Sequence, residues 1–374
     1  MCGIVGAISN RNVTPILMEG LRRLEYRGYD SAGIAIFEDK NIKRLRRAGK
    51  VQELQHAIDK TPINGHVGIS HTRWATHGTP TEKNAHPHLS EQDIALVHNG
   101  IIENYEVLKE ELLKNGFAFE SDTDTEVVVH RIQFHLTKTQ DLFKAVNLTV
   151  RELEGAYALA VISKDEPDKM IVARSGCPVV IGIGVNENYV ASDVAALLPV
   201  TNQFMFLEED DIAIIEQQNI TVIDVNGKSS ERAVVESKLS SAASERGEFK
   251  HFMLKEIHQQ AEAVENTLKA RIAGDQVLEN AFGPDATTVF DQIQAVHIVA
   301  CGTSYHAGLV ARYWIEEICR IPCSVEIASE YRYRNPVVPQ HTLFVAISQS
   351  GETADTLAAL RAAKKANYVS TLVI

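Results

Sequence analysis

The sequence lacks long apolar runs. None approaches the ~18 residues of a membrane-spanning helix, and the N-terminus has no basic leader typical of a signal peptide. Basic residues are in deficit, because 37 lysines and arginines stand against 49 acidic residues and give a formal net charge of -12. Nucleic-acid binding needs a basic face, so nucleic acid is not the expected partner. We expect a soluble cytoplasmic protein that binds neither membrane nor nucleic acid.

Cysteine is scarce and scattered, with five residues among 374. An odd and widely spaced set does not predict a disulfide framework. Cys319 and Cys323 lie close together, but no second ligand pair with zinc spacing accompanies them. We therefore predict no metal site.

The length and the hydrophobic content of 45% exceed what one core usually supports, and we predict two domains. Residues 2–240 mix short β-type runs with a few amphipathic helices, an α+β pattern in which helices pack on sheets. The predicted strands include CGIVGAIS, AGIAIF, HVGISHTRWATHG and GAYALAVISK; the predicted helices include TDTEVVVHRIQFHL and ENYEVLKEELLKNG. A small, polar, aperiodic stretch breaks the pattern at 236–250, and we place the linker at residues 241–255.

Residues 256–374 have a different rhythm, in which strands and helices alternate after a lead-in helix. AVHIVACGTS, CSVEIAS, TLFVAISQSG and YVSTLVI read as strands, with helical segments between them. This alternation predicts an α/β fold with a doubly wound parallel sheet covered on both faces. The sequence stops inside an apolar run, so we expect a chain truncated relative to a longer parent, with an incomplete second domain.

Cys2 lies directly behind the initiator methionine. One interpretation is a small apolar residue that begins a strand, because free cysteine is often buried. The alternative depends on removal of Met1, which would give Cys2 a free α-amino group with a reference pKa of about 7.7–8.0. Such an amine can act as general base beside its own thiol. One residue would then supply both nucleophile and base.

Three polar segments of the first domain offer partners for such a thiol. Asn99 and Gly100, in a turn predicted at 98–100, suit a developing oxyanion, although Asn-Gly is also an ordinary turn dipeptide. Arg73 suits a carboxylate, although a solvated arginine beside a packed Trp74 is the alternative. An aspartate at 122–126 suits a substrate ammonium, although these residues also fit a helix start.

Two turns of the second domain follow strands and open helices, at 301–304 and 348–353. Backbone N–H groups at a helix N-terminus, together with short hydroxyl side chains, form a site for an anion such as a sugar phosphate. Open parallel sheets bind ligands at this edge, beyond the carboxyl ends of the strands. The alternative is that these serines and threonines only cap helices.

Six segments of the first domain, in their order and spacing, together resemble one family: MCGIVG, LEYRGYDSAG, SHTRWATHG, NAHPH, VHNGIIEN and SDTDTEV. They resemble the glutaminase domain of the glutamine–fructose-6-phosphate aminotransferases, also called glucosamine-6-phosphate synthases. The resemblance implies the four-layered αββα sandwich of N-terminal-nucleophile hydrolases. It implies that Cys2 is the nucleophile and that Asn99 and Gly100 form the oxyanion hole. The remaining implied roles are glutamine binding by Arg73, Thr76, His77 and Asp124, and an ammonia-channel gate at Trp74.

The second domain resembles the first sugar isomerase (SIS) domain of the same family, through ACGTSYHAG, EIASEYRYR and SQSGETADT. The match implies contacts with fructose 6-phosphate from Thr303, Ser348, Gln349, Ser350 and Thr353. The family places its Schiff-base lysine and its isomerisation groups beyond residue 374, so no residue here is assigned to those roles.

The resemblance implies conversion of D-fructose 6-phosphate to D-glucosamine 6-phosphate with glutamine as nitrogen donor, the first step of the hexosamine (UDP-N-acetylglucosamine) pathway. It implies a homodimeric full-length parent and no metal or organic cofactor. Glutamine hydrolysis is the activity expected of this chain alone. Two alternatives stay open: another N-terminal-cysteine amidotransferase, although no phosphoribosyl domain or SGGxDS loop follows, and a non-catalytic sugar-phosphate-binding protein.

Overall fold

The computed structural model describes residues 2–237, 249, 251–268, 271–273, 276–283, 285–349, 351 and 353–374. Contacts along the chain divide it into two units, Met1–Glu248 and Phe249–Ile374. The predicted linker at 241–255 falls mostly outside the described residues, and its last four positions belong to a helix. Among the described residues, no helix is long and apolar enough to cross a membrane.

The first unit contains an eight-stranded antiparallel sheet with β1 in its interior. Two helices, α1 (Thr14–Arg23) and α2 (Val51–Lys60), cover its outer face. The strands in spatial order are Val234–Glu236 (β15), Gln203–Phe206 (β11), Val180–Ile183 (β9), Glu187–Ala191 (β10), Gly3–Ser9 (β1), Val67–Arg73 (β4), Ser31–Glu38 (β2) and Asn41–Ala48 (β3).

A second antiparallel sheet of seven strands packs on the inner face of the first. The helices on its outer side are α3 (Tyr105–Lys114), α4 (Asp124–Thr139) and α5 (Leu142–Val150). The strands in spatial order are Ser229–Ser230 (β14), Ile220–Ile223 (β13), Ile212–Ile215 (β12), Met170–Ser175 (β8), Gly155–Ser163 (β7), Ile94–Ile102 (β6) and His88–Ser90 (β5).

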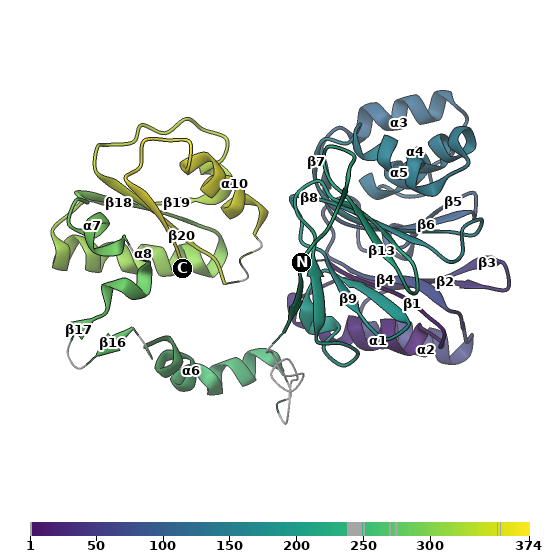
Figure 1. Ribbon diagram of the computed structural model, residues 1–374, viewed down its shortest axis with the longest axis horizontal. Coiled ribbons are helices and arrows are strands. Elements are labelled where there is room, and N and C mark those ends of the chain that lie inside the picture. The colour runs from purple at the N-terminus through teal and green to yellow at the C-terminus, as the bar shows by residue number, and fades with distance from the viewer. Residues whose placement is uncertain are drawn as a thin grey trace. The chain divides into compact units, whose positions relative to one another are not determined.

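Figure 1 shows the resulting four layers, with α3, α4 and α5 above the two sheets and α1 and α2 below them. Each interface has its own apolar core. Ile4 and Val97 lie in the core between the sheets, Leu17 in the core under α1, and Ile132 in the core under α4. The predicted αββα sandwich is confirmed, and its central core holds the start of β1 close to β4 and β6.

Local sequence signals account for the helices that border the site. Helix α1 has Pro15 in its first turn, where the missing N–H costs no intrahelical hydrogen bond. Helix α4 begins after Thr123, whose side chain accepts a hydrogen bond of 3.3 Å from the Glu126 N–H. This cap fixes the position of Asp124, the first residue of α4.

The second unit contains a four-stranded sheet in which every neighbouring pair is parallel. Apolar clusters cover both faces, one with α10 and one with α8, so the predicted doubly wound architecture is confirmed. The strands in spatial order are Cys323–Ile327 (β19), Ala295–Ala300 (β18), Thr342–Ile347 (β20) and Ser370–Val373 (β21). The helices are Phe252–Leu268 (α6), Ala286–Phe290 (α7), Gly302–Trp314 (α8), Ala328–Tyr331 (α9) and Ala354–Ala363 (α10), and a short hairpin joins Ile272–Ala273 (β16) to Gln276–Val277 (β17).

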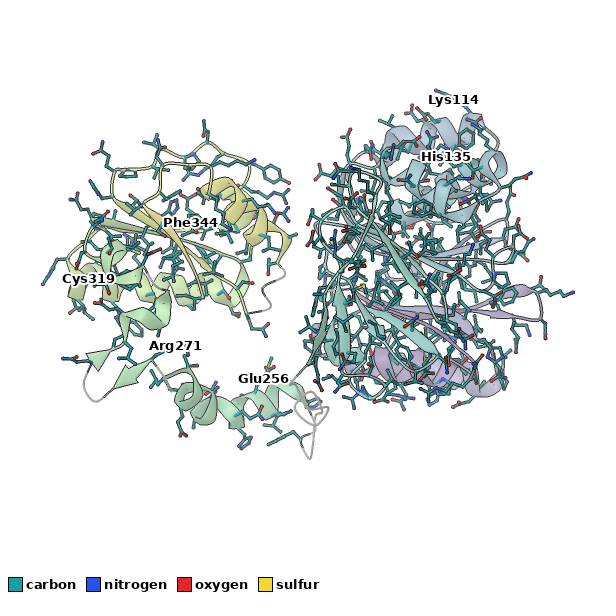
Figure 2. The ribbon with its side chains drawn as sticks, viewed as in Figure 1. Lys114, His135, Glu256, Arg271, Cys319 and Phe344 are labelled. Atoms are coloured by element: carbon teal, nitrogen blue, oxygen red, sulfur yellow. The ribbon has the colours of Figure 1, made fainter. Side chains whose placement is uncertain are left out.

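The strand order of this sheet reverses between β18 and β20, because the chain passes from β18 to β19 on one side and continues from β20 to β21 on the other. Ligands bind in open parallel sheets at such a reversal, outside the carboxyl ends of the strands. Figure 2 shows Phe344 of β20 among the side chains packed in this unit, whereas Cys319, which follows α8, is exposed.

Candidate active site

The Cys2 thiol lies half-buried at the start of β1, next to the residue that follows β4. The Trp74 N–H donates to Cys2 Sγ at 3.3 Å, and Sγ lies 3.6 Å from the Trp74 carbonyl oxygen. Burial raises the pKa of the Cys2 thiol, and the hydrogen bond with the Trp74 backbone opposes this only in part. The thiol is therefore protonated at neutral pH and needs a base before it can attack a carbonyl carbon.

Asn99 lies beside Cys2, on β6 of the other sheet. Its Nδ2 donates to the Cys2 carbonyl oxygen at 3.3 Å, and its side chain is buried. The prediction that residues 98–100 form a turn is wrong, because β6 continues to Ile102 and pairs with β7 throughout this stretch. The hydrogen bonds between β6 and β7 therefore fix the backbone position of Asn99.

Gly100 has a φ of +128°, which side-chain-bearing residues rarely adopt. A Cβ at this position would lie 1.9 Å from the Ala156 carbonyl oxygen. Glycine is therefore required both by the backbone conformation and by the close approach of β7.

Arg73 ends β4 with its side chain buried at 3% exposure. One guanidinium nitrogen donates to the His77 carbonyl oxygen, whereas Nη1 has no hydrogen-bond partner among the described residues. A buried, unpaired guanidinium nitrogen is costly unless a ligand satisfies it. A carboxylate is the anion that matches the planar guanidinium.

Asp124 supplies the opposite charge from the start of α4 and is also 3% exposed. Its Oδ2 accepts a hydrogen bond of 2.9 Å from the Ile102 N–H at the end of β6. Its Oδ1 lies 3.9 Å from His77 Nδ1. The carboxylate is thus held at a junction of β6 and α4 and retains acceptor capacity for a ligand ammonium.

The segment after β4 carries the more exposed candidates. Thr76 is exposed, and its hydroxyl lies 3.3 Å from His77 Nδ1. Trp74 is 55% exposed, and its indole lies beside Gly28, whose φ is +74°. Of the predicted glutamine-site residues, Arg73 and Asp124 are therefore buried, whereas Trp74, Thr76 and His77 lie on the segment that follows β4.

Two residues of this site escaped the sequence analysis. His71 is fully buried on β4, and its Nε2 lies 2.9 Å from Asn99 Oδ1. Asp30 accepts a hydrogen bond from the Ala75 N–H and donates its own backbone N–H to the Arg73 carbonyl oxygen at 2.7 Å. The alternation of strand residues was a usable signal for His71, because it lies two positions before Arg73 and shares its face of β4.

The groups around Cys2 suit one kind of ligand. Arg73 offers a cation suited to an α-carboxylate, Asp124 offers an anion suited to an α-ammonium, and the thiol lies beside an amide donor that can bind an oxyanion. An amino acid with a reactive carbonyl in its side chain satisfies all these groups together. The chemistry that they support is acyl transfer to sulfur.

The second unit brings the two predicted anion-binding turns to neighbouring parallel strands. Thr303 lies exposed in the first turn of α8, after β18, and Ser348 follows β20, where its hydroxyl accepts a 3.1 Å hydrogen bond from the Gly351 N–H. Gln349 is exposed, and Thr353 is the N-cap of α10 without a side-chain capping bond. Ser350 lies outside the described residues. The turns flank the reversal in strand order.

Comparison with known proteins agrees with this division. The glutamine amidotransferase domain family matches residues 71–199, and the SIS domain family matches residues 291–374. The B. subtilis glutamine phosphoribosylpyrophosphate (PRPP) amidotransferase, solved with ADP and GMP, is 19% identical with a TM-score of 0.55; the match covers 100% of this chain and 81% of that one. At that identity the likeness shows the fold alone.

The curated relatives extend over both units. The glutamine–fructose-6-phosphate aminotransferase [isomerizing] of Pseudomonas syringae is 56% identical over 375 residues, and that of Idiomarina loihiensis is 57% identical. Each match covers 100% of this chain, which spans 61% and 62% of those two relatives' lengths. Over its full length, through both the amidotransferase and the SIS regions, the chain is similar to glutamine–fructose-6-phosphate aminotransferases.

Proposed function

We propose that the first unit hydrolyses L-glutamine with Cys2 as the nucleophile. Sγ forms a bond to the side-chain amide carbon, and the carbonyl oxygen becomes an oxyanion that accepts hydrogen bonds from Asn99 Nδ2 and the Gly100 N–H. The C–N bond then breaks, ammonia leaves, and a γ-glutamyl thioester remains on Cys2. Water cleaves this thioester to glutamate and restores the thiol.

The proton balance needs a base beside Cys2, because burial raises the pKa of the thiol. We assign this role to the α-amino group of Cys2 after removal of Met1, since its reference pKa of about 7.7–8.0 suits proton exchange near neutral pH. The amine takes the thiol proton during attack and passes it to the departing nitrogen. No further protein base is required.

Arg73 and Asp124 hold the α-carboxylate and the α-ammonium of glutamine. The observation that carries the proposal is Nη1 of the buried Arg73, which has no hydrogen-bond partner in the described part of the chain and lies one residue before the Trp74 N–H that contacts the thiol. Thr76 and His77 add contacts from the segment after β4, and Trp74 is the gate through which ammonia leaves.

For the whole protein we propose glutamine-dependent conversion of fructose 6-phosphate to glucosamine 6-phosphate, the step that opens the hexosamine pathway. The phosphate binds at the reversal between β18 and β20, where the two turns carry Thr303, Ser348, Gln349 and Thr353. Ser350, assigned from the resemblance alone, is proposed as a further contact. We further propose that the full-length protein is a cytoplasmic homodimer. These statements rest on the relatives, of which this chain spans 61% in the first case.

The decisive experiment measures glutamate release from glutamine by the purified chain, with intact-mass confirmation that Met1 is absent. We expect release by the wild type and none by Cys2→Ala or by a sample that retains Met1. Cys2→Ser preserves the size of the side chain and serves as the matched control for folding. Hydrolysis that survives in Cys2→Ala would disprove the assignment of the nucleophile.

Sugar-phosphate binding is tested separately, by calorimetric titration with fructose 6-phosphate and with inorganic phosphate. Saturable binding of the sugar phosphate, together with Cys2-dependent hydrolysis, supports the full proposal. Binding without any glutamine turnover by processed, folded protein would instead favour a non-catalytic sugar-phosphate-binding role.

A further inference from the structure

His71 lies at full burial on β4, and its ring is the closest described partner of the Asn99 side chain. The Nε2 atom lies 2.9 Å from Asn99 Oδ1. The other ring nitrogen, Nδ1, has no hydrogen-bond partner among the described residues. The ring also stacks at a tilt against His86, with 4.3 Å between the ring centroids.

The direction of this hydrogen bond follows from the other end of the Asn99 side chain. A carbonyl oxygen can only accept, so the Asn99 atom 3.3 Å from the Cys2 carbonyl must be the amide nitrogen. The amide oxygen therefore faces His71, and His71 Nε2 must carry the proton. His71 is thus assigned to the tautomer protonated on Nε2.

We propose that His71 is a positioning residue of the glutaminase reaction: its Nε2–H holds the Asn99 carboxamide in the one orientation that presents Nδ2 to the oxyanion formed at Cys2. The inference rests on the proposed function, because it assigns a supporting role to a residue outside the reacting groups. A rotated carboxamide would set its NH₂ group against the Nε2–H, donor against donor, and would turn an acceptor toward the oxyanion.

The surroundings of His71 keep this donor fixed. Burial lowers the pKa of His71 to about 3, so the ring is neutral at physiological pH and keeps one defined N–H. The hydrogen bond to Asn99 and the backbone of His98 favour a charged ring but do not offset burial, and the charges of His98 and Arg73 act in the same direction as burial on the pKa. A neutral donor orients the amide without adding a charge beside the nucleophile.

The test compares three variants of the whole chain in steady-state glutamine hydrolysis. His71→Leu removes the donor, and His71→Gln retains an N–H near the position of Nε2. His130→Gln is the control at another buried histidine, on α4, whose Nδ1 lies 2.8 Å from the Ser90 hydroxyl. Removal of one oxyanion donor lowers kcat by about 10²–10³. For His71→Leu, which misorients that donor, we expect kcat to fall by roughly 10–10².

Three further measurements distinguish a positioning role of His71 from a purely structural one. We expect the KM of His71→Leu for glutamine to stay within about threefold of wild type, because Arg73 and Asp124 still bind the α-groups. We expect His71→Gln to recover most of the lost kcat and His130→Gln to match the wild type. Alkylation of Cys2 by iodoacetamide, followed by peptide mass spectrometry, should proceed at the wild-type rate in His71→Leu, since this reaction uses no oxyanion hole.

The outcomes separate the inference from the function on which it rests. If the wild-type chain is inactive although Met1 has been removed, the proposed function itself is wrong. An active wild type with an equally active His71→Leu would overturn the role of His71. Equal losses in His71→Leu and His71→Gln, or a loss carried by KM alone, would likewise overturn it, because neither depends on a donated N–H.

Discussion

The two candidate sites of this chain are built in different ways. In the candidate glutamine site the charged and amide residues are buried, with Arg73 and Asp124 at 3% exposure and Asn99 at 7%. Asp124 and Asn99 each accept a hydrogen bond from a distant segment, and Arg73 donates one to the His77 carbonyl oxygen. In the sugar-phosphate site Thr303 and Gln349 are exposed, and Ser348 bonds only within its own turn.

The candidate glutamine site is thus built from preorganised side chains. The proposed sugar-phosphate site would instead depend on backbone N–H groups at helix starts. In the first, the proposed contacts of Arg73, Asp124 and Asn99 belong to buried side chains, and removal of such a side chain also takes a hydrogen-bond partner from a neighbouring group. In the second, backbone groups survive mutation of the side chains around them. Substitutions should therefore have large effects in the first unit and small effects in the second.

The largest effect is expected from Arg73→Met. Loss of a buried charge partner costs about 3–5 kcal/mol, so kcat/KM for glutamine should fall by about 10³, mostly through KM. Arg73→Lys keeps the charge but not the planar guanidinium group, and its kcat/KM should lie between those of Arg73→Met and the wild type. Steady-state glutamate release measures both, and an unchanged KM in Arg73→Met would remove Arg73 from the site.

Glycine-to-alanine substitutions test the same difference between the two units through the free energy of unfolding. Gly100→Ala should destabilise the first unit by about 3 kcal/mol or more, because its Cβ would lie 1.9 Å from a backbone oxygen at a strained φ. Gly302→Ala is the matched control, with a φ of +56° and open space around the new Cβ, and should cost only about 1–2 kcal/mol. Urea unfolding compares them, and equal costs would contradict the contrast.

Acid should destabilise the first unit before the second. Burial lowers the pKa of His71 to about 3, and it also lowers the pKa values of His86, His88 and His98. The unfolded chain takes up these protons near pH 6.5, so the stabilisation is complete above that pH and is lost as the pH falls toward 3. Each histidine adds about 1.4 kcal/mol per pH unit to the slope.

The second unit has one buried histidine among its described residues, His297, whose pKa burial also lowers. Pulse proteolysis with mass spectrometry between pH 7 and 5 reports the unfolded fraction of each unit in the intact chain. His86→Gln should reduce the slope of the first unit by about 1.4 kcal/mol per pH unit. A second unit that unfolds first on acidification would contradict the prediction.

The smallest effect is expected at the sugar-phosphate turns. Ser348→Ala and Thr303→Ala each remove one neutral hydrogen-bonding group, worth about 1 kcal/mol, and should weaken fructose 6-phosphate binding by roughly fivefold. Calorimetric titration measures this, and glutamate release is the internal control, which should not change. A loss of binding by 10² or more would show that side chains rather than backbone groups hold the phosphate.

The sequence predicted the elements that carry strong local signals. Helix α4, with Thr123 as its cap, and the parallel strands of the second unit form as expected. Asn99 and Gly100 were placed in a turn because Asn-Gly is a common turn dipeptide, and the pairing of β6 with β7 overrides this local preference.

Contacts between residues that are far apart in the chain could not be predicted from the sequence. His71 meets Asn99 across 28 positions, and Asp30 holds the segment after Arg73 from 45 positions away. A buried histidine in an apolar strand gives no local sign of its partner. The motif resemblance supplied the proposed reacting residues, whereas their partners His71 and Asp30 became visible only in the folded structure.

Trp74 gives the molecule an optical readout of its own. Its backbone contacts the thiol while the residue is 55% exposed, so a ligand that orders the segment after β4 would transfer the indole from water to protein. The chain has only two tryptophans, and the other, Trp314, belongs to the second unit. With Trp314 replaced by phenylalanine, the emission wavelength of Trp74 should report binding at the candidate glutamine site without any added dye.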